Sequence, residues 1–252
     1  MNVRNSVADW DRWPVNQYLA ENYRELHASD DAVIVHHSAF YRRFAPGQLS
    51  RTLEFGAGPN LYPLILAGAA SQRIDAVDRS AACLAYLLGQ QRFGPDPSWQ
   101  AFHARCRELN PDLPDLATIL ARVLVVPGDG LEIPAGRYDA ASMNFVAESV
   151  TEDAAEFAAF CRAFVHAVRP GGHLVAAFME NMASYRLGDG SRWPGYPVDR
   201  AAVRAAFAPY VTDLTLDRID PDPGLPAYGY TGMVLLTARR AGCADDASDR
   251  DA

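Results

Sequence analysis

The chain has 252 residues, and 49% of them are hydrophobic, which is enough apolar sequence for a globular domain with a sizeable core. Its formal net charge of −8 argues against nucleic-acid binding, and its four scattered cysteines indicate reduced thiols rather than a disulfide framework or a metal site. No apolar run approaches the ~18 residues of a membrane-spanning helix and no leader-like segment opens the sequence, so we expect a cytoplasmic protein without membrane contact.

The first elements are predicted to be helices. Apolar and aromatic side chains recur at three- and four-residue spacing from Val15 to Leu26, which is typical of an amphipathic helix. A second helix is expected after Ser29, Asp30 and Asp31, because short polar side chains can cap a first turn. We therefore predict an N-terminal helical cap over residues 1–45.

From Arg51 onward, short apolar strands alternate with longer helical segments. The predicted strands span 51–55, 73–77, 123–126, 138–143 and 173–178, and the predicted helices span 61–70, 80–91 and 153–169. This alternation is typical of a mostly parallel sheet flanked by helices, which we assign to a ligand-binding domain over residues 46–241. Within it, residues 93–122 are expected to form an insertion with one or two short helices, and residues 242–252 a frayed acidic tail.

The stretch RTLEFGAGPNLYP, residues 51–63, joins the first strand to its helix through a glycine turn. Such a turn lies at the carboxyl edge of the sheet, where open α/β folds bind ligands, and glycine lets a ligand approach the main chain. Three interpretations are open: a dinucleotide site, a site for S-adenosylmethionine, and a tight turn without a ligand. A dinucleotide turn needs a third glycine and a free N–H for the pyrophosphate, but Pro59 and Asn60 follow Gly58. The pattern favours S-adenosylmethionine, which carries no phosphate.

Two acids follow the next strands. Asp78 ends the second predicted strand, where a carboxylate can accept hydrogen bonds from both hydroxyls of a ribose. Because NAD and S-adenosylmethionine share this ribose, Asp78 does not separate them, and a solvated acid at a strand end is the alternative. Asp129 follows the third strand, where a carboxylate can receive the amino group of an adenine, although Gly-Asp-Gly is also common in turns.

Several longer stretches carry a family resemblance that covers about residues 14–240. They are YLAENY (18–23), LEFGAGPNLY (53–62), DAVDRS (75–80), NFVAESV (144–150), RPGGHLVAAF (169–178) and SYRLGDGSRWPGYPVDRAAVRAAF (184–207). With them the chain resembles the nicotinamide, phenylethanolamine and thioether methyltransferases, which methylate small molecules on nitrogen or sulfur. The paired tyrosines, the tyrosine of the glycine turn and the late Tyr-x-x-Gly stretch together are typical of this family.

The resemblance implies a site for S-adenosylmethionine, position by position. Tyr18 and Tyr23 match tyrosines of an N-terminal helix that close over the cofactor, one of them towards its carboxylate. Gly56, Gly58 and Tyr62 match the turn that holds the methionine portion. Without the resemblance, the two tyrosines of the helix would be interpreted as core packing.

Further along the chain, the resemblance implies the contacts to the nucleoside. Asp78 matches the acid that binds the ribose, and Asp129 with Gly130 matches the pair on the adenine side. Asn144 matches a small polar residue near the methionine end, after the fourth strand. No metal site is implied.

An amine acceptor must be neutral and aligned with the methyl group, so it needs a group that steers it or takes up its proton. The resemblance implies a carboxylate after the fifth strand, and Glu180 matches this position if the alignment is shifted by one residue. We predict Glu180 as the catalytic and acceptor-binding acid. The alternative is that Glu180 is a solvated glutamate at the end of a strand. Glu148 is a further candidate acid. A pocket for a flat acceptor is predicted from the aromatic residues Tyr185, Trp193, Tyr228 and Tyr230, which can otherwise be core packing.

Together these observations predict an α/β fold of the Rossmann-like, seven-stranded class I methyltransferase type with a helical N-terminal cap. Its last helix is expected at 199–208, behind the cap residue Asp199, before an antiparallel hairpin of strands at 211–219 and 230–239. The expected function is methylation of a small-molecule amine or heteroaromatic nitrogen, in bacterial natural product biosynthesis, by a monomer or weak homodimer. The alternatives are O- or S-methylation, an NAD(P)-dependent oxidoreductase, and a non-catalytic protein that binds S-adenosylmethionine.

Overall fold

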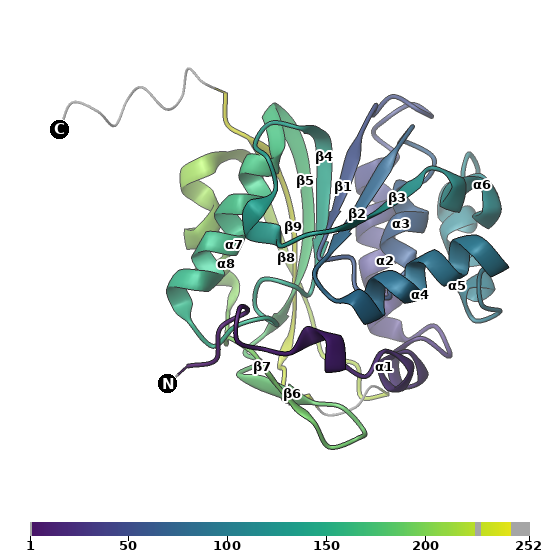
Figure 1. The fold of residues 1–252 in the computed structure, drawn as a ribbon. Coiled ribbons are helices and arrows are strands. Elements are labelled where there is room, and N and C mark those ends of the chain that lie inside the picture. Colours follow the sequence, from purple (N-terminus) through teal and green to yellow (C-terminus); the bar gives the residue numbers. More distant parts are fainter. Residues whose placement is uncertain (1, 225–227, 243–252) are drawn as a thin grey trace.

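A central sheet of seven strands organises the molecule (Figure 1). The computed structural model describes residues 2–224 and 228–242. Its strands are β1 Thr52–Phe55, β2 Ile74–Asp78, β3 Val123–Pro127, β4 Tyr138–Asn144, β5 Val168–Glu180, β8 Val211–Ile219 and β9 Gly232–Arg240, in the spatial order β3-β2-β1-β4-β5-β9-β8. The predicted seven-stranded, Rossmann-like α/β fold is therefore confirmed.

The strand order reverses next to β1, and this reversal positions the site. β1 pairs in parallel with β2 on one side and with β4 on the other, so the chain leaves the sheet in opposite directions after β1 and after β4. β9 pairs antiparallel with both β5 and β8, as predicted for the last two strands. A ligand crevice is expected at the carboxyl ends of β1 and β4, where the connections diverge.

Helices cover both faces of the sheet, and Figure 1 shows the two layers on opposite sides of the strands. One layer contains α2 Ala28–Tyr41, α3 Tyr62–Ala67, α4 Ala81–Phe93, α5 Trp99–Leu109 and α6 Leu116–Ala121, and the other contains α7 Ala154–Ala167 and α8 Arg200–Phe207. The short helix α1 Val15–Asn22 and the 3-10 turns η1 Trp10–Arg12, η2 Gly130–Glu132 and η3 Ala208–Tyr210 complete the helical elements. The predicted insertion supplies α5 and α6.

Side-chain caps fix where four of the described α-helices begin. Ser80, Asp115, Asp153 and Asp199 each accept a hydrogen bond from a backbone N–H in the first turn of the helix that follows. The prediction of Asp199 as a cap is confirmed. The helix α2 begins earlier than expected, after His27, so that Asp30 lies inside its first turn.

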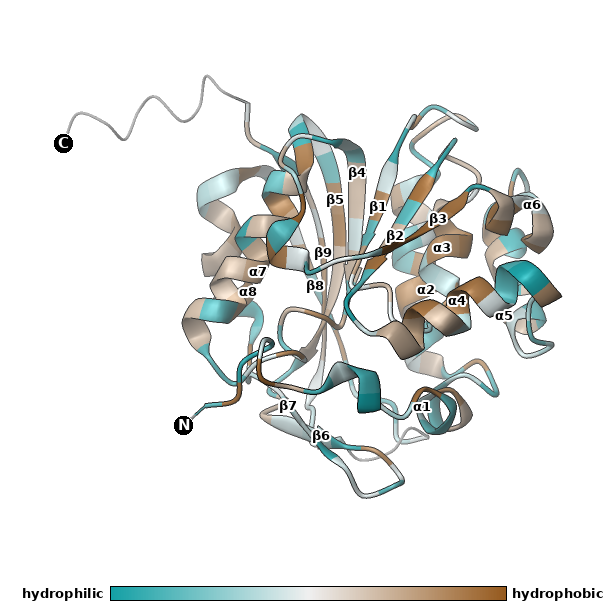
Figure 2. Ribbon diagram, in the orientation of Figure 1, coloured by the Kyte–Doolittle hydropathy of each residue, from teal (hydrophilic) through white to brown (hydrophobic). Residues whose placement is uncertain are grey.

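Two apolar clusters fill the space between the sheet and its helices, and Figure 2 shows hydrophobic residues along the central strands. Successive side chains of β5 point to opposite faces of the sheet and so contribute to both clusters. Val175 and Ala177 pack towards α2 and α3, whereas Ala176 and Phe178 pack towards α7 and α8. The side chains of Val33 and Ile34 in α2 are fully buried, so this helix is part of the main core.

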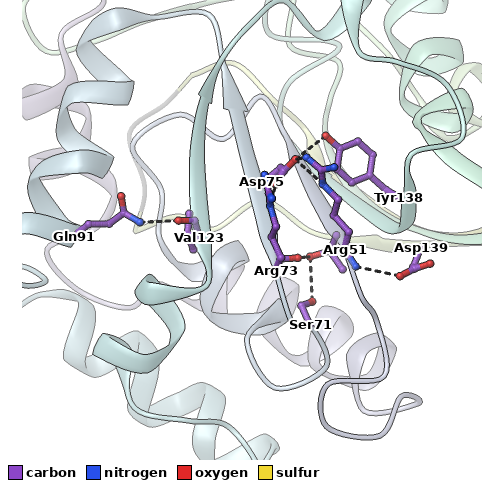
Figure 3. Close-up of polar contacts among 9 residues, drawn as sticks. Arg51, Ser71, Arg73, Asp75, Gln91, Val123, Tyr138 and Asp139 are labelled. Carbon is purple, nitrogen blue, oxygen red and sulfur yellow. Dashed lines mark hydrogen bonds and ion pairs between the residues drawn. The ribbon is translucent and has the colours of Figure 1, made fainter.

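A buried ionic cluster ties the amino ends of β1, β2 and β4 together (Figure 3). The carboxylate of Asp75, 1% exposed, accepts hydrogen bonds from Arg51, from Arg73 at 2.8 Å and from the hydroxyl of Tyr138 at 3.1 Å. Removing one partner of such a cluster leaves a buried charge without compensation. The cluster lies at the edge of the sheet opposite the glycine turn, so its role is structural.

Three features differ from the sequence-based predictions or lie beyond them. An additional two-stranded hairpin, β6 Ser184–Arg186 with β7 Arg192–Pro194, lies below the carboxyl edge of the sheet. β5 begins at Val168, earlier than predicted, because α7 already ends at Ala167. The predicted frayed tail falls almost entirely on residues 243–252, outside the described residues. None of the described helices has the length and apolar character needed to cross a membrane.

Candidate functional site

Two glycines of the turn between β1 and α3 have positive φ angles, +67° at Gly56 and +54° at Gly58, which glycine adopts without strain. A Cβ on Gly56 would lie 2.6 Å from Cγ1 of Val146, so this glycine is required by packing as well as by its dihedral angle. A Cβ on Gly58 would meet no atom within 4 Å and would project into open space. The turn therefore combines a tight contact at Gly56 with an open approach at Gly58.

Asp78 closes this turn from the end of β2. Its carboxylate accepts hydrogen bonds from the backbone N–H of Gly58 at 2.7 Å and of Ser80 at 2.8 Å. Burial raises the pKa of Asp78, while these N–H donors act against the rise. Each carboxylate oxygen keeps a further lone pair, which can accept a hydrogen bond from a ligand hydroxyl.

A cavity opens beside this turn, at the point where the strand order reverses. We call it the first cavity. Its lining combines the glycine turn with the ends of β2 and β4 and with the start of the chain, and includes Asn5, Trp10, Trp13, Tyr18, Glu54, Phe55, Gly56, Gly58, Asp78, Cys83, Asp129, Gly130, Asn144, Phe160 and Tyr185. Seven of the predicted cofactor residues line it: Tyr18, Gly56, Gly58, Asp78, Asp129, Gly130 and Asn144. The fold thus brings together residues that are far apart in the sequence.

One part of the lining of the first cavity is apolar. A Cβ on Gly130 would lie 2.7 Å from Cε1 of Phe55, so glycine is needed there for the ring to pack. The rings of Phe55 and Phe160 pack edge to face. Asp129 borders this part and already accepts hydrogen bonds at 3.0 Å from both Asn5 and Arg79. The arrangement suits an aromatic base such as adenine.

Another part of the lining is polar. The side-chain amide of Asn144 donates to Glu54 at 3.1 Å, and Ser142 donates to the other carboxylate oxygen of Glu54. Burial raises the pKa of Glu54 to about 7. The amide oxygen of Asn144 is buried, and the side chain of Asn144 also interacts with the imidazole of His37. Sequence reasoning missed Glu54, although an acid inside a buried strand is an unusual signal.

The start of the chain crosses the opening of the first cavity, and we call residues 3–13 the N-terminal strap. Several hydrogen bonds hold it: the backbone N–H of Asn5 donates to Glu156 at 3.0 Å, the carbonyl of Trp10 accepts from the hydroxyl of Ser80 at 2.9 Å, and the side-chain carboxylate of Asp11 accepts from the N–H of Ala81 at 2.7 Å. Figure 1 shows this segment running below the carboxyl edge of the sheet. Sequence reasoning did not identify the strap, because its anchors lie some 70 to 150 positions away.

A second cavity adjoins the first. Trp13, Tyr18, Phe145, Ser149 and Tyr185 line both, and the second cavity is further lined by Asn22, Tyr23, Asp30, Met179, Met182, Leu187, Tyr228 and Met233. The hydroxyls of Tyr18 and Tyr23 share a hydrogen bond of 3.0 Å, and the amide of Asn60 donates to Tyr23. The two predicted tyrosines thus form the wall between the cavities and the packed core.

The predicted acceptor residues are divided between cavity and packing positions. Tyr185 lines both cavities and accepts a hydrogen bond from Trp13, and Tyr228 lines the second cavity. Trp193 lies behind the strap, where it stacks on Trp10 at a centroid distance of 5.2 Å. The described lining of the two cavities includes neither Trp193 nor Tyr230, which packs against the apolar clusters instead.

Two further expectations need correction. Glu180 is outside the described lining of both cavities: it follows Met179, which faces the second cavity, so its own side chain points to the opposite face of β5. There it pairs with Arg218 at 2.9 Å and accepts a hydrogen bond from Thr231. Tyr62 is fully buried in the core, where its ring stacks on Phe102, and it is likewise outside the described cavity lining.

Glu148 is a positioning residue. Its side chain is fully buried and accepts a hydrogen bond at 2.8 Å from the backbone N–H of Met179, which lines the second cavity. Burial raises the pKa of Glu148 to about 8. It therefore shapes the second cavity through the backbone of β5.

No protein-family model and no curated protein sequence matches this chain. Solved structures share its fold. The N-methyltransferase NodS from Bradyrhizobium japonicum WM9, in complex with S-adenosyl-L-homocysteine, is 17% identical over 94% of each chain, with a TM-score of 0.50. The protein of the DhpI–SAM–HEP complex is 17% identical over 94% of this chain and 92% of that chain, and its TM-score is also 0.50. The [4+2]-cyclase SpnF is 14% identical over 88% of this chain and 86% of that chain, with a TM-score of 0.55.

At these identities the likeness establishes the fold. The chain has the seven-stranded, Rossmann-like fold that the neighbouring S-adenosylmethionine-dependent methyltransferases share. The narrower resemblance to the nicotinamide and phenylethanolamine enzymes stays a prediction. Because one neighbour is a cyclase, the fold by itself does not define the reaction, and the function has to be argued from the site.

Proposed function

We propose that this protein is an S-adenosylmethionine-dependent methyltransferase that acts on a small-molecule acceptor. The observation that carries the proposal is Asp78, held by two backbone N–H groups at the end of β2 and open to the first cavity. Pro59 removes one N–H from the adjacent turn, so a pyrophosphate would find a poor cradle there. A ribose acid without a phosphate site favours an adenosyl ligand over a dinucleotide.

The residues of the first cavity fit this cofactor along its length. Asp78 would hold the ribose, the apolar part beside Phe55 and Asp129 would hold the adenine, and Asn144 with Glu54 would meet the methionine end. The amide oxygen of Asn144 can accept a hydrogen bond from an ammonium group there. When bound, the cofactor supplies an electrophilic methyl group on its sulfonium, and the protein's task is to position the acceptor.

The second cavity supports an amine or heteroaromatic acceptor. It meets the first cavity between Tyr18, Phe145 and Tyr185, so an acceptor in it would lie next to the methionine end of the cofactor. Its walls are aromatic and methionine side chains, which suit a flat ring and can stabilise a cationic centre. We place such a reaction in small-molecule biosynthesis, carried out by a monomer or weak homodimer.

Thermal unfolding with candidate cofactors tests the proposal. S-adenosylmethionine and S-adenosyl-L-homocysteine should each raise the melting temperature in a concentration-dependent way, whereas NAD and NADP should not. Equal stabilisation by NAD would reject the methyltransferase in favour of an oxidoreductase. Binding of both adenosyl ligands without methyl transfer to any acceptor would instead indicate a non-catalytic binding protein.

A further inference from the structure

Asp30 is a buried carboxylate in the wall of the second cavity. It lies in the first turn of α2, its side chain is 5% exposed, and it is part of the cavity lining together with Asn22, Tyr23 and Tyr228. None of the ion pairs between described residues includes Asp30. A buried carboxylate without a cationic partner is costly to keep charged, so burial favours its protonated form until a cation lies beside it.

The surroundings of Asp30 make this carboxylate a strong acceptor for a proton. Asp30 interacts electrostatically with five ionisable side chains, which are Tyr18, Tyr23, Tyr62, Asp222 and Tyr230. None of them carries a positive charge. Burial, with the nearby Asp222 as a second cause, raises the pKa of Asp30 to about 8. The carboxylate can therefore exchange a proton with an amine near neutral pH.

We propose that the carboxylate of Asp30 receives the ammonium group of the acceptor in the second cavity and takes up its proton before methyl transfer. This inference rests on the proposed function and names the acceptor class as a small amine. One N–H bond of the ammonium breaks, its electron pair stays on nitrogen as the lone pair, and the proton forms an O–H bond on Asp30. The neutral amine is then competent to attack. Aromatic walls around Tyr18 and Tyr185 stabilise the cation on arrival.

The neighbouring residue supplies a matched control. Asp31 is the same residue type in the same helical turn, but it pairs with Arg105 and is not part of the described cavity lining. Asp30→Asn removes the cavity charge at almost constant shape, and Asp31→Asn removes a charge outside the cavity. Comparing them separates a cavity effect from a general effect of net charge on α2.

The experiment measures ligand binding by calorimetry in saturating S-adenosyl-L-homocysteine. The probes are amines with their isosteric alcohols: benzylamine with benzyl alcohol, 2-phenylethylamine with 2-phenylethanol, and tryptamine with tryptophol. Wild type and Asp31→Asn should bind at least one amine about 10-fold or more tightly than its alcohol, the scale of a charge-assisted hydrogen bond. Asp30→Asn should lose this preference and keep its affinity for S-adenosyl-L-homocysteine.

The outcomes separate the two proposals. Failure of wild type to bind S-adenosyl-L-homocysteine would overturn the proposed function. Normal binding of that ligand without any preference for amines in wild type, or an equal loss of preference in both variants, would overturn the role of Asp30 alone. For the amine that binds best, the wild-type pH profile of kcat/KM should contain a transition that is absent from Asp30→Asn. An identical pH profile in the variant would show that Asp30 does not accept the proton.

Discussion

We expect cofactor binding to depend most directly on Asp78. Asp78→Ala would remove the proposed acceptor for two ribose hydroxyls and would also leave the N–H groups of Gly58 and Ser80 without their partner. The affinity for S-adenosyl-L-homocysteine should fall by about 1.5–3 kcal/mol, the scale of hydrogen bonds to a charged group. Calorimetry measures this loss, and circular dichroism checks that the variant is folded. An unchanged dissociation constant in a folded variant would make Asp78 a structural acid only.

Two glycines of the turn and one glycine of α4 separate backbone strain from steric conflict. Gly56→Ala should destabilise the protein by more than ~2 kcal/mol, because the added methyl meets Val146 in addition to the cost of a positive φ angle. Gly58→Ala carries the backbone cost alone, about 1–2 kcal/mol. Gly89 lies inside α4 with open space around it, so Gly89→Ala should stabilise by up to ~1 kcal/mol. Urea unfolding gives all three values, and equal effects at Gly56 and Gly58 would refute the steric argument.

Among the elements, the N-terminal strap is expected to serve the cofactor more than the fold. A chain that begins at Pro14 loses Asn5 and Trp10 from the first cavity but keeps the packed core. We expect its affinity for S-adenosyl-L-homocysteine to fall by 10-fold or more, about 1.4 kcal/mol, with a small change in melting temperature.

A longer truncation provides the contrast. Removing residues 1–27 also removes Tyr23, which is 3% exposed and packs on Trp99 and Phe102. That loss opens the core, so stability should fall by about 3–5 kcal/mol. If the chain that begins at Pro14 bound the ligand as tightly as wild type, the strap would have no part in the site.

At the scale of the whole molecule, three buried carboxyls give stability a distinct pH dependence. Burial raises the pKa of Asp30 to about 8, of Glu54 to about 7 and of Glu148 to about 8. Each folded pKa exceeds its unfolded value near 4, so the folded state binds more protons and stability falls as pH rises towards 8. Below pH 6.5 the buried His37 and the half-buried His36 and His173, whose pKa values are lowered, act in the opposite direction.

The melting temperature of the ligand-free protein should therefore fall between pH 6.5 and 8.5. Glu148→Gln should reduce this fall, because it removes one buried charge and keeps an oxygen that can accept from Met179. The exposed Glu25 provides the control, and Glu25→Gln should leave the pH profile unchanged. A wild-type melting temperature that stays level or rises over this range would show that these carboxyls are not protonated in the folded state.

Local patterns in the sequence determined where the main strands lie along the chain, the glycine turn and the position of Asp78. These features depend on apolar periodicity and on residues close together in the chain, which is why the predicted seven-stranded sheet is confirmed. The antiparallel position of the last two strands also agreed with expectation. The small hairpin β6–β7 escaped prediction because its strands are only three residues long.

Only the tertiary structure decided which acids face the cavities. Glu180 and Met179 are neighbours in sequence, but the alternation of side chains along β5 sends them to opposite faces, where Glu180 meets Arg218 from β8. Asp30 appeared as a simple capping residue in the sequence, yet the packing of α1 and α2 beside β5 and β9 encloses it in the second cavity. The burial of a side chain and the charges beside it depend on contacts between residues far apart in the chain. The sequence therefore identified candidate acids, but only the structure showed the environment of each acid.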